Sequence, residues 1–191
     1  MAYKTNKNKM KKIIIAAAAI LGFATSSFAQ SNASDAASQT VNLALSNALE
    51  ITFTSTGTNT GDVLTLPFTT VNDYANGVES DPQQIRVRSN KTFHVTVKAS
   101  NEKFMVTNGN GTQQSNFYVQ NVLDVKMSAN ATGGSTTFSN YKDLTENNQT
   151  FLSNATYGGN QLFSVKYRAT PGFQMPAGTY TTNVIYTASQ P

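Results

Sequence analysis

The residues best suited to chemistry in this sequence are a loop of oxygen donors. The spacing places four carboxylate or amide side chains within nine residues, and these are Asp73, Asn76, Glu79 and Asp81. Calcium takes hard oxygen ligands of this kind. The spacing is not that of an EF-hand loop, so a plain polar loop is the alternative reading. We treat the four residues as calcium candidates.

Nucleophilic and acid–base chemistry has little support in the sequence. His94 is the single histidine, and alternation places it with Thr96 and Lys98 on the polar face of a predicted strand. No Gly-x-Ser-x-Gly motif is present, and the absence of cysteine excludes a thiol nucleophile, a disulfide and a thiolate metal site. The ten acidic residues are scattered, although two could meet as a glycosidase pair. We predict no catalytic residue and no cofactor.

The N-terminus has the three zones of a secretion signal. Several lysines precede the uncharged apolar run 13–24, and small residues follow as far as Ala29. Cleavage after Ala29 would leave residues 30–39 as a flexible leader and 40–191 as one domain. The alternative is an uncleaved anchor, but a spanning helix needs about 20 apolar residues. The sequence therefore predicts export to the periplasm, the cell surface or the medium, with membrane contact only through the signal peptide.

The charge of the chain supports this reading. The full sequence has a formal net charge of +4, but five of its lysines and none of its acidic residues lie before residue 30. The remainder carries nine basic and ten acidic residues, a formal charge of −1. An electrostatic argument for nucleic-acid binding is therefore lost.

Period-two alternation of apolar residues recurs from Val41 onward, and no sustained helical period is present. It predicts strands around 41–45, 49–53, 64–68, 85–88, 93–98, 119–127, 163–167 and 180–186. The residues around Ser89–Lys91 predict a hairpin whose two arms share one sheet face. Loops are expected over 71–81 and 101–116, with a turn at 108–111, a further turn at 131–135, and one short strand or helical turn within 136–157. The pattern favours an all-β fold, a single immunoglobulin-like Greek-key β-sandwich, with a closed barrel as the alternative.

Exposed aromatic side chains would be needed for glycan binding. Tryptophan is absent, and three tyrosines lie at core parity. The remaining candidates are Tyr74, Tyr118, Tyr141 and Tyr157, each of which could equally anchor a loop.

The end of the chain resembles known secreted domains. Residues 176–181, Pro-Ala-Gly-Thr-Tyr-Thr, with Val184 and Tyr186 after them, are similar to the closing strand of spore coat protein U-like domains and, more loosely, of pilin-type subunits. The resemblance implies a β-sandwich that is assembled on the cell surface. The chain departs from chaperone–usher pilins in lacking cysteine and in having five residues after Tyr186.

The alternating segment near the predicted leader suggests a partner. Val41, Leu43 and Leu45 are the strand-exchange candidates, because such a strand can complete its own sheet or add to the edge of a neighbour. Completion of its own sheet is the favoured expectation. The leading functional hypothesis is a non-enzymatic structural, adhesive or fibre subunit that binds itself or another surface protein. A glycan- or protein-binding module and a secreted hydrolase are the second and third hypotheses.

Overall fold

The computed structural model describes residues 37–55, 63–109 and 111–191, and the chain divides into two units, 1–44 and 45–191. In the first unit the described residues, 37–44, have exposed side chains and belong to no helix or strand. The predicted signal peptide, 1–29, and residues 30–36 of the predicted leader lie outside the described residues. In the described part of the chain, no helix has the length and apolar character needed to cross a membrane.

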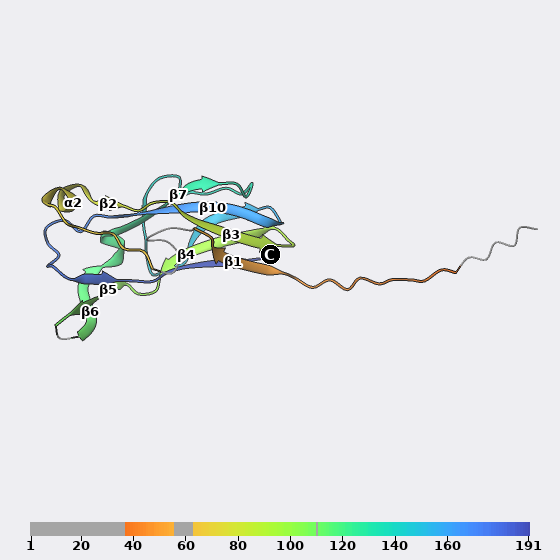
Figure 1. The fold of residues 1–191 in the computed structure, drawn as a ribbon, viewed down its shortest axis with the longest axis horizontal. Coiled ribbons are helices and arrows are strands. Elements are labelled where there is room, and N and C mark those ends of the chain that lie inside the picture. The colour runs from red at the N-terminus through yellow and green to blue at the C-terminus, as the bar shows by residue number, and fades with distance from the viewer. Residues whose placement is uncertain (1–36, 56–62, 110) are drawn as a thin grey trace, which may run out of the picture. The chain divides into compact units, whose positions relative to one another are not determined.

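The second unit is built of antiparallel strands in three sheets, which confirms the predicted all-β sandwich (Figure 1). Sheet A has the order β1 (Leu49–Phe53), β3 (Gln83–Ser89), β10 (Gly158–Ala169), β7 (Leu123–Asn130) and β8 (Lys142–Asp143), and β2 (Val78–Glu79) also pairs with β10. Sheet B has the order β12 (Val184–Ser189), β4 (Phe93–Ala99) and β9 (Gln149–Ala155). Sheet C has the order β11 (Thr179–Thr181), β5 (Lys103–Asn108) and β6 (Gly111–Tyr118).

The core lies between the inner faces of sheets A and B. Ile85 and Val87 of β3 are 0% exposed, and so are Phe93, Val95 and Val97 of β4. Burial of each large apolar side chain stabilises the fold by about 1.5–3 kcal/mol. The strict alternation of buried and less buried residues in β3 and β4 is the consequence of facing this core on one side only.

The predicted hairpin at Ser89–Lys91 is wrong. β3 pairs with β1 and β10, whereas β4 pairs with β12 and β9, so the connection passes from one sheet to the other. The apolar sets of the two strands face each other across the core instead of sharing one face. Alternation identifies the inward face of a strand, but it does not identify the neighbouring strand.

Three loop or strand boundaries also differ from expectation. The stretch 101–116 is largely the β5–β6 hairpin rather than a loop, and its last paired residues, Asn108 and Gly111, are the ends of the expected turn. The closing strand is two strands, because β11 pairs with β5 and β12 pairs with β4. The loop 71–81 contains the short helix α2 (Val71–Asn76), which begins with a capping box between Thr70 and Asp73.

The middle of the chain is more regular than its sequence suggests. A 3-10 turn, Val119–Asn121, precedes β7, so the predicted strand 119–127 begins later than expected. The turn 131–135 is present, and the poorly patterned stretch 136–157 contains β8 and β9. Residues 64–68 form no strand, although Leu64, Leu66 and Phe68 pack against the core with the expected alternation.

Candidate functional site

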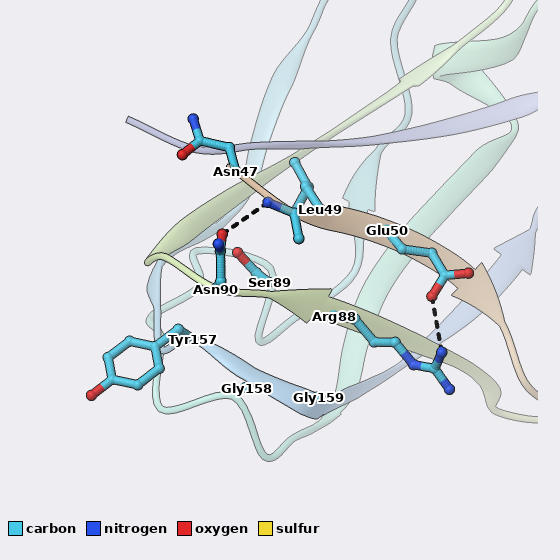
Figure 2. Close-up of a pocket in the computed structure, with 10 residues that line it drawn as sticks. Asn47, Leu49, Glu50, Arg88, Ser89, Asn90, Tyr157, Gly158 and Gly159 are labelled. Carbon is cyan, nitrogen blue, oxygen red and sulfur yellow. Dashed lines mark hydrogen bonds and ion pairs between the residues drawn. The ribbon is translucent and has the colours of Figure 1, made fainter. Parts of the chain in front are cut away.

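A network of hydrogen bonds around Asn90 fixes residues 46–48, and Figure 2 draws the bond that the Asn90 side-chain oxygen accepts. The Asn90 side chain accepts a hydrogen bond from the Ala48 amide at 2.9 Å and donates one to the Ser46 carbonyl at 2.8 Å. The Asn90 amide also donates to the Ala48 carbonyl at 3.2 Å. Asn90 therefore holds both ends of the short segment between Leu45 and β1.

The C-terminal region reaches the same network. The Gln190 side-chain amide donates to the Ala48 carbonyl and the Ser89 hydroxyl, both at 2.9 Å, and contacts the Asn90 side-chain oxygen at 3.2 Å. We call this set of contacts among Ser46, Ala48, Ser89, Asn90 and Gln190 the latch. It joins the entry of the chain, the β3–β4 connection and the end of β12.

A hollow of about 630 Å³ lies beside the latch. It is lined by Asn47, Ala48, Leu49, Glu50, Arg88, Ser89, Asn90, Tyr157, Gly158 and Gly159. Two of these residues, Glu50 and Arg88, form an ion pair at 3.4 Å, and a third, Tyr157, has 67% of its surface exposed (Figure 2). Because both charged side chains are about half exposed, the ion pair contributes little to stability.

Strands β1 and β12 lie side by side at one margin of the sandwich, and their inward-facing side chains remain partly exposed to solvent. The inner residues of β1 and β12 lie opposite buried residues of β3 and β4 in the strand register. None of them is fully buried, and Leu49 and Phe53 remain 39% and 40% exposed. We call this apolar strip the seam, and it consists of Leu49, Ile51, Phe53, Val184, Tyr186 and Ala188.

Aromatic contacts join the seam to the core. The ring of Phe53 meets that of Tyr186 edge to face at a centroid distance of 6.1 Å, and Tyr186 meets Phe151 in the same way at 5.5 Å. The hydroxyl groups of Tyr186 and Tyr167 lie 3.1 Å apart. Burial raises the pKa of Tyr167 to about 12 and raises the pKa of Tyr186 as well, so both hydroxyls remain protonated at neutral pH.

The strand-exchange candidates form no strand in this structure. Residues 41–48 carry no strand assignment, and Val41, Leu43 and Leu45 are 74%, 83% and 87% exposed. The expected completion of the chain's own sheet is therefore observed for β1, which pairs with β3, but not for residues 41–45. Three apolar side chains at two-residue spacing are left in contact with water.

The second hollow has a volume of about 650 Å³ and lies between residues 63–68, β11 and the ends of β7 and β10. Its lining mixes polar side chains with apolar ones, among them Phe68, Phe104, Met175 and Tyr180. Tyr74, a glycan candidate, contacts Phe68 at a ring distance of 5.5 Å and stacks on Phe173 at 5.9 Å. Tyr74 therefore anchors the loop around α2.

The calcium candidates have separate contacts in the structure. The Asp73 carboxylate accepts hydrogen bonds from the amides of Thr69 and Thr70 at 2.8 and 2.7 Å, and these bonds lower its pKa. Asn76 donates to a helix carbonyl, Glu79 lies 3.8 Å from the Lys166 ammonium group, and the Asp81 carbonyl accepts bonds from neighbouring side chains. Across residues 37–55, 63–109 and 111–191, no group of three or more acidic or histidine side chains is placed to hold a metal ion.

A cluster that the sequence did not indicate lies on β7, β8 and β10. Asp124 lies directly opposite Asp143 in the strand register, and Arg168 donates to Asp124 at 2.6 and 3.1 Å. Burial and the neighbouring Asp124 raise the pKa of Asp143. The Tyr141 ring lies under Arg168 at 4.4 Å and Lys126 at 4.2 Å. The Arg168 guanidinium group therefore neutralises Asp124, and the Asp143 carboxyl group lies beside this ion pair.

The other residues considered for chemistry have structural contacts. His94 lies on the outer face of β4, where its Nδ1 atom accepts a hydrogen bond from the Asn154 amide at 3.4 Å. The Tyr118 ring is covered by the Lys103 ammonium group at 4.8 Å. Tyr157 is thus the most exposed of the tyrosines considered for glycan binding.

Comparison with known proteins adds little to this picture. No protein-family model matches the chain, and no curated protein matches it. A solved structure of a family 123 glycoside hydrolase from Clostridium perfringens, described for glycolipid glycan hydrolysis, matches with 17% identity and a TM-score of 0.30. The match covers 74% of this chain and 24% of that chain, so this chain spans about a quarter of the hydrolase. A similarity of this size carries no argument about fold or activity.

Proposed function

We propose that the protein is a non-enzymatic, exported structural subunit that assembles at the cell surface through addition of its N-terminal strand. The observation that carries the proposal is the exposure of Val41, Leu43 and Leu45, which are at least 74% exposed. Alternating apolar residues in an extended segment are the pattern that strand addition uses, because main-chain hydrogen bonds give affinity and alternate side chains enter pockets.

The sandwich supports this proposal because it has edge strands to which a further strand could be added. In the part of the chain that the structure describes, β12 pairs only with β4, and β1 pairs only with β3. An edge strand presents a row of backbone donors and acceptors to any added strand. The second candidate function, a glycan-binding module, has the exposed Tyr157 beside the hollow as its supporting observation.

Deletion of residues 30–46 tests the proposal. The deletion variant should remain a folded monomer, because β1 and the latch residues Ala48, Ser89 and Gln190 remain. The full chain should form larger species as its concentration rises. Sedimentation velocity and negative-stain microscopy would report assembly, and circular dichroism would report folding.

Two results would count against the proposal. A deletion variant that unfolds would show that residues 30–46 complete their own domain. A full chain that stays monomeric at every concentration would show that it does not assemble with itself. A glycan array with a hit that Tyr157→Ala abolishes would favour the binding module.

A further inference from the structure

We propose that the seam is the acceptor for the segment Val41–Leu45 of a second copy of this chain, which pairs with the outer edge of β12. The inference rests on the proposed function and specifies both the partner and the place of contact. It starts from the observation that the segment and the seam have the same chemical pattern in the same chain.

The spacing of the seam matches that of the segment. Both lips of the seam, β1 and β12, present an inner apolar side chain at every second residue. The segment presents Val41, Leu43 and Leu45 at the same spacing. An added strand with this period places all three side chains on the seam, because successive side chains of a strand point to opposite faces.

The edge of β12 lacks the features that normally prevent strand addition. Residues 184–189 contain no charged residue and no proline, whereas soluble proteins commonly protect edges with both. Ile185 lies on the outer face of β12 and is 38% exposed. The alternation places Asn42 and Ala44 of the added strand on this outer face, where Ala44 can cover Ile185.

The latch directs the segment to a second copy. For residues 41–45 to lie along the seam of their own chain, the chain would have to reverse direction within residues 46–48. Ser46 and Ala48 are already hydrogen-bonded to Asn90, and Gln190 adds a further bond to Ala48. Folding back would break these bonds, while addition to a second copy leaves them intact.

A complementation experiment with two variants tests the inference. Leu43→Lys disrupts the added segment Val41–Leu45 and leaves the seam unchanged. Leu49→Lys places a charge in the seam and leaves the segment unchanged. The full-length chain, purified after whatever processing its N-terminus undergoes, should form a ladder of oligomers by native mass spectrometry. Each variant alone should be monomeric, with association weakened about tenfold or more by the loss of one buried leucine. An equimolar mixture should give dimers and nothing larger.

Controls keep the experiment interpretable. Val71→Lys introduces the same charge at a 73% exposed site on α2 and should assemble as the wild type does. Ala188→Lys is a second seam variant in case Leu49→Lys fails to fold. A labelled peptide of residues 38–47 should bind the Leu43→Lys chain, and the same peptide carrying lysine at position 43 should not.

The outcomes separate the two proposals. Loss of assembly in Leu43→Lys but not in the seam variants would overturn the seam and leave strand addition standing. A wild-type chain that never assembles and whose seam stays unoccupied would overturn both. A wild-type chain that stays monomeric while its seam is occupied by another envelope protein, or by residues 41–45 of the same chain, would overturn the assignment to a second copy.

Discussion

The side-chain amide group of Asn90 holds residues 46–48 in place. It accepts a hydrogen bond from the backbone amide of Ala48 and donates one to the backbone carbonyl of Ser46. Its sequence context, Ser-Asn-Lys, indicates only a turn. The partners Ser46 and Ala48 are more than forty positions away, at separations of 44 and 42 residues. No local pattern in the sequence predicts such a pairing, which depends on how β1 lies against β3.

Replacement of Asn90 should therefore make residues 46–48 less firmly held. In Asn90→Ala we expect the amide of Ala48 to exchange with solvent faster and the free energy of unfolding to fall by about 1 kcal/mol, because the bonds are solvent-exposed. Hydrogen–deuterium exchange and urea unfolding would measure the two effects. Asn140→Ala, at an exposed loop position, is the matched control and should change neither. Unchanged exchange at Ala48 in Asn90→Ala would contradict the latch.

The carboxylate pair gives a prediction about pH at the same scale. The pKa of Asp143 is raised from 3.8 in the folded protein, so folding favours its protonated form. The resulting stability is present below pH 3.8 and is lost as the pH rises through the raised value. Asp143→Asn should remove this loss and be at least as stable as the wild type at neutral pH.

Thermal unfolding measured from acid to neutral pH would check this expectation. Asp81→Asn, which removes an exposed carboxylate in the loop before β3, is the control for the change in net charge. A drop in the neutral-pH melting temperature of Asp143→Asn but not of Asp81→Asn would mean that Asp143 stabilises the cluster as an anion. The alternation of β7 did not predict this pair, because Asp124 and Asp143 meet only through the β7–β8 register.

At the scale of the elements, alternation predicted which face of a strand points inward, but it did not predict which strands pair with each other. Alternation identified the apolar residues that face the core in the middle of three strands: Ile85 and Val87 of β3, Phe93, Val95 and Val97 of β4, and Phe163, Val165 and Tyr167 of β10. It did not identify the buried polar residues Gln83, Ser89 and Ser164. The pairing of β3 with β4 was not correct, because a short connection can join strands of one sheet or of two. Residues 64–68 show the same limit, since they pack with alternation but form no strand.

At Gly134 the turn 131–135 packs closely against β9, and a substitution there tests this contact. A Cβ atom at Gly134 would lie 2.6 Å from the Ser153 carbonyl oxygen and 3.0 Å from the backbone of Ala155 in β9. Gly134→Ala must displace the turn 131–135 from β9, at a cost of about 1–3 kcal/mol, the usual range for overpacking. Chemical denaturation would measure the loss.

Gly109→Ala is the matched control for this substitution. A Cβ atom at Gly109 meets no atom within 4 Å, and no positive φ is recorded there. The change should therefore be neutral or stabilise the fold by less than about 1 kcal/mol through a smaller unfolded-state entropy. Equal effects of the two substitutions would show that the approach of the turn to β9 is looser than the backbone distances indicate.

At the scale of the whole molecule, the proposed assembly has an electrostatic consequence. Residues 36–48 contain no charged side chain, and neither does β12. The charged residue on the lip β1 is Glu50, which is paired with Arg88. The chain after residue 29 carries a formal charge of only −1, so repulsion between copies is weak.

Assembly should accordingly depend little on salt. Screening weakens contacts between exposed charges as the Debye length falls from about 10 Å at 0.1 M to about 3 Å at 1 M, but it does not weaken apolar burial or main-chain pairing. We expect the sedimentation profile of the full chain to be nearly unchanged across this range, while the Leu43→Lys variant stays monomeric throughout. An assembly that dissociates as salt is raised would instead be held by surface charges such as Arg86, Arg88 or Lys98, and the segment 41–45 would not be its main contact.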